Sequence, residues 1–342
     1  MFAERPFRSG VYTPMFRGLA LLGIGLALPS FAMSWMVCMP GRSAPFVAEF
    51  ADSEDTVRIL RAGVEHLAND IGERNVAHPE GLQRAAEWLR EQFQHSRRSV
   101  HEQTYEVEGV SCANLEVELL GNDRPSEIVV VGAHYDSALG SPGANDNASG
   151  TVALVLLAQR LAARPALSRT VRLVAFVNEE PPHFQTSNMG SRRYAQQCRY
   201  RAETVVAMLS LETIGYYTNR PNSQHYPFPF NLAYPSRGDF VAFVADRASR
   251  DLVRRVVGSF RSHAQFPSEG GALPNTLPGV GWSDHESFWR VGYPATMVTD
   301  TAPYRYPWYH KAEDTPDKID YARLAQVVDG LERVIVDLAN SP

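Results

Sequence analysis

Two short apolar segments rich in β-branched residues constrain the fold more than any other feature of the chain. They are Glu127–His134, EIVVVGAH, and Thr170–Val177, TVRLVAFV. Runs of this kind are typical of central strands that are covered on both faces. The segment between them, Ala148–Ala163, has the length and pattern of a helix. Strand, helix and strand in this order predict a parallel β-α-β crossover and therefore the α/β class.

The flanking segments continue this alternation of helices and strands. Apolar residues at three- and four-residue spacing predict amphipathic helices at 52–72 and 79–96. We also expect strands at 104–110, 114–121, 204–212, 239–246 and 294–300, and helices at 250–264 and 321–340. The predicted fold is α/β, with a mixed, mostly parallel central sheet flanked by helices on both faces. Thr218–Arg237 and Gln265–Trp282 are expected to be long irregular loops that shape a specificity pocket.

The N-terminus has the pattern of a targeting segment. Arg5, Arg8 and Arg17 precede an uncharged run from Gly18 to Gly41. One interpretation is a cleaved signal peptide with a small-residue site at Ser30–Ala32. The other is a membrane anchor, because the run exceeds the roughly 20 residues that a bilayer requires. Both interpretations export the rest of the chain, to the periplasm or the extracellular space.

Composition and length set the remaining limits. The 342 residues carry 33 basic and 38 acidic side chains, a net charge of −5, with no basic block that would favour nucleic acid as a partner. We expect residues 1–45 to form the signal peptide or membrane anchor and residues 46–342 a single domain. In an exported chain Cys112 and Cys198 could form a disulfide, and two separate thiols are the alternative.

Imidazole and carboxylate groups follow nearly every predicted central strand. The candidates are His134, Asp136, Asp146, Glu179, Glu180, Glu212 and His310. In an α/β sheet the carboxyl ends of the strands form the ligand site. Nitrogen and oxygen ligands suit zinc, and this set exceeds what one four-coordinate ion can use. The sequence therefore favours two metal ions that share a carboxylate, a known hydrolytic arrangement.

Six segments in order resemble the two-zinc exopeptidase family. They are AHYDS, GANDNASG, NEE, SLETIGY, SDHESF and YHKAEDTPDKID. That family holds secreted leucine-type aminopeptidases and glutamate carboxypeptidases, and it shares its fold with glutaminyl cyclases and transferrin receptor ectodomains. The resemblance covers roughly Asp52 to the end of the chain. It implies a three-layer fold, two Zn²⁺ ions per chain and a peptide substrate.

The resemblance also implies the metal ligands. His134 matches a ligand of one zinc, and Asp146 matches the carboxylate that bridges both ions and precedes a cis peptide bond. Glu180 and His310 match ligands of the other zinc. Glu212 stands where many members have aspartate, and its longer side chain is expected to reach the metal.

Three further residues match catalytic positions of the family. Glu179 matches the general base that takes a proton from the attacking water, and Asp136 matches the carboxylate that orients His134. Tyr309 matches a donor to the developing oxyanion. Asp284 and His285, in SDHESF, match positions near the substrate in the family, so both a direct role and a role in capping the following helix stay open.

The sequence thus predicts a zinc-dependent exopeptidase, most consistent with an aminopeptidase. Two alternatives of the same fold stay open: a single-zinc glutaminyl cyclase-like aminoacyltransferase and a non-catalytic receptor-type ectodomain. The adjacent Glu179 and Glu180 raise one geometric question, because neighbours on a strand point to opposite faces. A turn directly after the strand would let both side chains reach one site.

Overall fold

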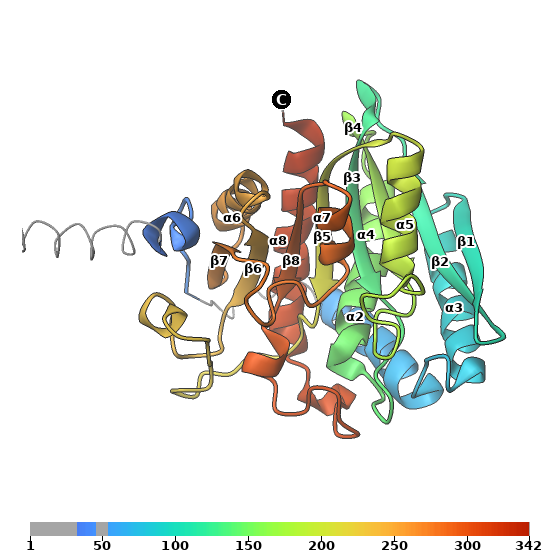
Figure 1. The fold of residues 1–342 in the computed structure, drawn as a ribbon, viewed down its shortest axis with the longest axis horizontal. Coiled ribbons are helices and arrows are strands. Elements are labelled where there is room, and N and C mark those ends of the chain that lie inside the picture. The colour runs from blue at the N-terminus through green and yellow to red at the C-terminus, as the bar shows by residue number, and fades with distance from the viewer. Residues whose placement is uncertain (1–32, 46–53, 342) are drawn as a thin grey trace, which may run out of the picture.

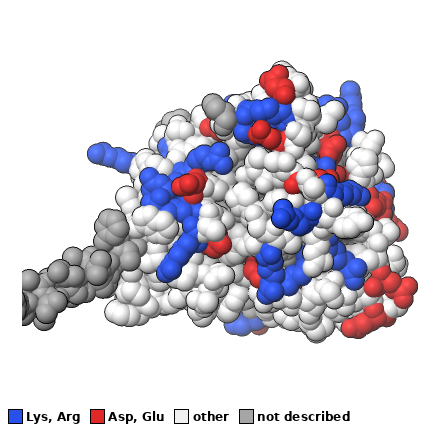
Figure 2. All heavy atoms as spheres, turned by 45° about the horizontal axis from the view of Figure 1, so that its top comes forward, with Lys and Arg blue, Asp and Glu red and all other residues white. Residues whose placement is uncertain are grey.

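The computed structural model describes residues 33–45 and 54–341 (Figure 1). The predicted signal peptide or anchor falls largely on residues 1–32, outside the described residues. Within the described part, no helix is long and apolar enough to cross a membrane. On the face that Figure 2 presents, basic and acidic side chains stand next to one another, in keeping with the modest net charge of −5.

A mixed eight-stranded sheet forms the centre of the molecule, with the strand order β1-β2-β4-β3-β5-β8-β6-β7. The four central strands β4, β3, β5 and β8 are mutually parallel, and β1 and β2 add antiparallel at one edge. At the other edge β6 runs antiparallel to β8 and pairs in parallel with β7. The strands are β1 Val100–Val107, β2 Val110–Leu119, β3 Arg124–His134, β4 Arg169–Phe176, β5 Thr204–Glu212, β6 Val241–Asp246, β7 Ser268–Leu273 and β8 Ala295–Thr299.

Helices cover both faces of this sheet (Figure 1). Along β3, Val129 and Val131 belong to the core that includes α3, α4, α6 and α8, whereas Val130 packs with Tyr194 of α5 and Phe288 of α7. This alternation is the period of two that a strand covered on both faces requires. The helices are α2 Glu54–Glu65, α3 Pro79–Gln94, α4 Gly150–Ala162, α5 Gly190–Tyr200, α6 Arg250–His263, α7 His285–Arg290 and α8 Tyr321–Asn340, with a π-helical turn at His66–Ile71. The predicted three-layer α/β architecture is confirmed.

Three elements differ from the sequence prediction. The first strand, expected at 104–110, is β1 at Val100–Val107 and ends before the turn at 108–109. β7 lies inside Gln265–Trp282, which was expected to be an irregular loop. Its sequence, SEGGAL, contains two glycines and has low strand propensity, and it is a strand because β6 offers it a parallel partner. Helix α5 was not predicted. Cys112 and Cys198 are both free and buried, so the structure has separate thiols in place of the alternative disulfide.

Residues 33–45, which we call the N-terminal strap, lie against α6 and β7. The Arg261 guanidinium donates to the carbonyl oxygen of Pro40 at 3.2 Å, and the Ser268 N–H donates to Ser43 Oγ at 2.8 Å. Met33, Met36 and Val37 of the strap pack on a small cluster that includes buried Phe230, Leu273 and Val280. The strap, although part of the predicted N-terminal segment, is therefore packed on the folded domain.

Candidate metal centre

Three parallel strands bring imidazole and carboxylate groups to one edge of the sheet. β3 ends at His134, β5 ends at Glu212, and the chain after β4 continues to Glu179 and Glu180. Because the carboxyl ends of parallel neighbours lie at the same edge, these four side chains converge. All four are buried.

Asp146 lies between two histidines and connects two groups of ligands. Its Oδ1 is 3.4 Å from His134 Nε2, and its Oδ2 is 3.1 Å from His310 Nε2. Glu212 Oε2 lies 3.2 Å from His134 Nε2, and Glu180 Oε2 lies 3.1 Å from His310 Nε2. Two three-residue groups able to hold a metal ion therefore share Asp146, as a bridging carboxylate would.

The turn after β4 explains how two adjacent glutamates reach one centre. Asn178 has a positive φ of 61°, which ends the alternation of the strand. Glu179 Oε2 then lies 3.9 Å from His134 Nε2, while Glu180 faces His310. Glu179 and Glu180 consequently contact different halves of the centre.

Asp136 fixes this turn and one histidine together. Its Oδ1 accepts the backbone N–H of Glu179 at 3.2 Å, and its Oδ2 accepts that of Glu180 at 3.1 Å. The same carboxylate lies 3.5 Å from His134 Nδ1. Orienting a ligating histidine is a common task of such a carboxylate. Asp136 thus positions three of the candidate residues from one buried place.

The loop that presents Asp146 turns tightly before α4. Gly143 has a left-handed φ of 62°, and a Cβ atom there would lie 2.4 Å from the carbonyl oxygen of Asp146. Only glycine fits such a position without a shift of the backbone. The peptide bond between Asp146 and Asn147 is cis, as the resemblance implied.

Three supporting residues were not recognised from the sequence. Asp314 accepts the backbone N–H groups of Asn145 and Asp146, at 2.8 and 3.1 Å. Ser283 Oγ donates to Glu212 Oε2 at 2.8 Å. The fully buried Arg74 donates to carbonyl oxygens of the loops around the site, those of Tyr135, Pro142 and Gly143. Asp314 and Ser283 lie in the quoted motifs, but nothing in the sequence singles out Arg74.

The centre concentrates negative charge in a buried place. Burial and the neighbouring Asp146 raise the pKa of Glu180 to about 8, and burial raises that of Glu179 well above its usual range. Burial alone would lower the pKa of His310, but its contacts with Asp146 and Glu180 raise it to about 10. Without a cation, the site therefore holds protons that a divalent ion would displace.

Several buried donor and acceptor atoms of the centre make no satisfactory hydrogen bond among the described residues. They are His134 Nδ1 and Nε2, Asp146 Oδ2, Glu180 Oε1 and His310 Nε2. Burying polar atoms without a partner costs free energy, so a cluster of such atoms indicates a binding site for an ion or another ligand. Imidazole nitrogens with carboxylate oxygens are a donor set that suits zinc, and the residues present fit two such ions.

Tyr309, Asp284 and His285 differ in their relation to the centre. The ring of Tyr309 stacks on that of His310, with 3.9 Å between centroids and 23° between planes. Asp284 is fully buried and its pKa is raised to about 7, chiefly by burial. His285 Nε2 contacts the carbonyl oxygen of Val280 at 2.8 Å and its ring packs edge-on against Trp289, which is a structural role.

Fold and site together define an aminopeptidase-like α/β fold with a candidate metal centre at the carboxyl edge of its sheet. The model of Peptidase family M28 matches residues 114–335, and the chain belongs to this family.

Two relatives are similar to this chain over most of its length. The chain is 36% identical over 336 residues to the uncharacterized protein YfbL of Escherichia coli, covering 96% of this chain and 98% of that one. It is 25% identical to "Probable aminopeptidase YDR415C" of Saccharomyces cerevisiae, over 75% of this chain and 66% of the relative.

Two solved structures share the fold. A zinc aminopeptidase from Bacillus subtilis superposes with a TM-score of 0.64 at 15% identity, over 88% of this chain and 97% of that one. The glutaminyl cyclase of Fimbriiglobus ruber superposes with a TM-score of 0.61 at 19% identity, over 86% and 97%. At these identities the superpositions establish the architecture only.

Proposed function

We propose that this protein is a two-zinc aminopeptidase, which hydrolyses the first peptide bond of its substrate. The observation that carries the proposal is the pair of ligand groups joined by Asp146, with Glu179 beside them. Family membership supports peptide-bond hydrolysis, and a relative named as a probable aminopeptidase supports attack at the N-terminus. The bridged pair of groups favours a peptidase over a cyclase that uses one zinc.

In this proposal His134, Asp146 and Glu212 hold one ion, and Asp146, Glu180 and His310 hold the other. Bound zinc supplies a Lewis acid for the scissile carbonyl and lowers the pKa of a water molecule towards neutrality.

Glu179 accepts the proton of the attacking water and passes it to the leaving amine. Asp136 keeps the Glu179 backbone in place through its hydrogen bond to the N–H. Burial and the nearby carboxylates raise the pKa of Tyr309 well above its usual range, so its hydroxyl stays protonated and can donate to the developing oxyanion.

The test replaces Glu179 by glutamine. Because this proposal assigns Glu179 to the proton and not to a metal ion, E179Q should keep its zinc content while the hydrolysis of leucine amide falls about 10²- to 10⁴-fold. Metal analysis and the rate of amide hydrolysis measure the two effects. The matched control is E180Q at the neighbouring position, which should lose metal as well as activity.

The outcomes separate the candidate functions. Near-normal turnover by E179Q would remove Glu179 from the role of base. Hydrolysis of N-blocked dipeptides in preference to amides with a free amino group would indicate a carboxypeptidase. Formation of pyroglutamyl product from glutaminyl peptides, with one zinc per chain, would indicate a cyclase, and absence of zinc and of both activities would indicate a binding domain.

A further inference from the structure

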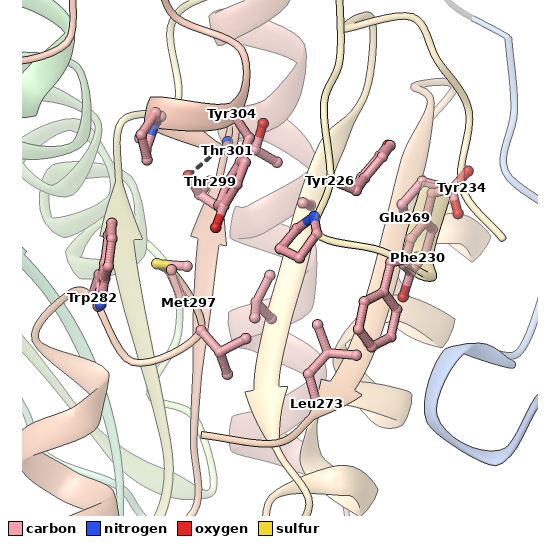
Figure 3. Close-up of a pocket in the computed structure, with 18 of the residues that line it drawn as sticks. Tyr226, Phe230, Tyr234, Glu269, Leu273, Trp282, Met297, Thr299, Thr301 and Tyr304 are labelled. Carbon is pink, nitrogen blue, oxygen red and sulfur yellow. Dashed lines mark hydrogen bonds between the residues drawn. The ribbon is translucent and has the colours of Figure 1, made fainter. Parts of the chain in front are cut away.

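A deep cavity opens directly beside the metal centre. Its volume is about 100 Å³, and Glu212 and Tyr309 of the centre belong to its lining. Its floor is formed by β6, β7 and β8, where Ala242, Val244 and Met297 face the cavity, and the two long loops cover it (Figure 3). In an aminopeptidase, the side chain of the first residue of the substrate would extend from the metal centre into this space.

Aromatic rings line the part of the cavity away from the candidate metal centre. Tyr226 and Tyr234 stack with centroids 5.5 Å apart and planes 28° apart, and Phe230 lies near them (Figure 3). The Tyr226 hydroxyl donates to the carbonyl oxygen of Pro235, and that of Tyr234 donates to the carbonyl oxygen of Gly270, each at 2.8 Å. Because both hydroxyls have partners, the two tyrosines can offer a ligand their ring faces.

One carboxylate, that of Glu269, lies among these rings (Figure 3). Glu269 belongs to β7, and Gly270, Gly271 and Leu273 of the same strand also line the cavity. Among the described residues Glu269 pairs with Arg261, whose Nη2 is 3.7 Å from Glu269 Oε2, longer than a hydrogen bond. Arg261 Nη2 instead donates to the carbonyl oxygen of Ser268 at 2.7 Å. Arg261 therefore attracts the Glu269 carboxylate without a hydrogen bond to it. The carboxylate oxygens can still accept hydrogen bonds from a ligand.

The surroundings of Glu269 favour a cationic ligand over a neutral one. Its side chain is 26% exposed, and burial raises its pKa although Arg261 opposes this. An apolar ligand would remove the remaining water from this carboxylate without compensation, which costs free energy. An ammonium or guanidinium group would pair with it and could also lie against the tyrosine rings.

We propose that Glu269 makes this enzyme selective for substrates whose first residue has an apolar stem and a cationic end, as in lysine or arginine. The apolar lining takes the stem, and Glu269 with Tyr226 and Tyr234 takes the charge. This proposal rests on the proposed aminopeptidase function, because it assigns the cavity to the side chain of the first residue.

The first test compares lysine amide with norleucine amide, whose side chain has a similar stem without the charge. The wild-type enzyme should prefer lysine amide about tenfold or more in kcat/KM, since a charge-assisted hydrogen bond contributes enough for such a ratio. E269Q should lose this preference mainly through KM and should hydrolyse norleucine amide at least as well as the wild type. The matched control is E102Q, which removes a carboxylate paired with Arg90 outside the cavity. It should leave the preference for lysine amide over norleucine amide unchanged.

The second test measures binding and does not depend on hydrolysis. Hexylamine should raise the melting temperature of the zinc-loaded wild-type protein more than hexanol does, and E269Q should abolish the difference. If no amide is cleaved but this difference is found, the proposed function fails and the cation site stands. Equal effects of E269Q on both amides, or equal shifts with hexylamine and hexanol, would overturn the proposal for Glu269.

Discussion

Glu179 and Glu180 show how a local change of backbone separates two chemical roles. On a continued strand the side chains of Glu179 and Glu180 would point to opposite faces. Asn178, with a φ of 61°, ends the strand geometry, and Asp136 accepts the N–H of both glutamates. The sequence predicted the convergence, because a turn directly after the strand would end the alternation of side chains. The hydrogen bonds to Asp136 depend on how β3 and β4 pair in the sheet.

Shortening Glu212 by one methylene group tests whether this residue is a metal ligand. Its carboxylate reaches to 3.2 Å from His134 Nε2 and is held by Ser283. In E212D the shorter side chain should withdraw from His134 and weaken one of the two metal sites. We expect its zinc affinity to fall about 10- to 100-fold, with the site of Glu180 and His310 still filled.

Titration of the metal-free E212D protein with zinc, followed by calorimetry, checks this prediction. The wild type should show two sites of high affinity and E212D only one. The conservative variant S283T, which keeps the hydroxyl donor to Glu212, serves as the control. Two undiminished sites in E212D would show that Glu212 is not a ligand.

At the scale of elements, the N-terminal strap and β7 support the cavity together. β7 is an edge strand with two glycines, and the strap lies beside it through Ser43 and the contacts of Arg261. Met33, Met36 and Val37 pack on the cluster of Phe230, Leu273 and Val280, which are all part of the cavity lining. The strap therefore stabilises the wall that carries Glu269.

Truncation of the chain tests this role of the strap. Compared with a protein that begins at Met33, one that begins at Pro45 loses the packing of Met33, Met36 and Val37. Loss of about 2–3 kcal/mol of apolar packing should lower the melting temperature by about 3–5 °C. KM for lysine amide should rise in the shorter protein. Thermal unfolding with equal midpoints for both proteins would contradict the prediction.

At the scale of the whole molecule, the buried acids make stability depend on pH when zinc is absent. Folding raises the pKa of Glu180 to about 8 and that of Asp314 to about 7, from ordinary values of 4.5 and 3.8, chiefly through burial. A group with a raised pKa stabilises the fold below its unfolded pKa, and this contribution is lost as pH rises through the folded value. The pKa of His310 is raised from 6.5 to about 10, so its stabilising contribution is likewise lost as pH rises above 6.5.

We therefore expect the metal-free protein to become less stable between pH 5 and 8. Zinc requires deprotonated ligands, so the stabilisation by zinc should grow over the same range. Melting temperatures of chelator-treated and zinc-loaded protein at pH 5.5, 6.5 and 7.5 measure the effect, and the gap between them should widen with pH. A gap that stays constant would mean that these groups do not exchange protons for zinc.

The sequence by itself determined the α/β class, most helices and strands, and the residues that meet at the carboxyl edge of the sheet. It could do so because hydrophobic periodicity and strand ends are local, and because His134, Asp146, Glu179, Glu180, Glu212 and His310 lie in recognisable motifs. Tertiary structure alone decided the rest. β7 exists through its pairing with β6, Asp314 acts on a loop about 170 positions earlier in the chain, and Arg74 ties together carbonyl groups from separate loops. Glu269 likewise lies beside Tyr226 and Tyr234 only because the folded chain brings two distant loops together. Burial and pairing depend on neighbours in space, which the sequence does not give.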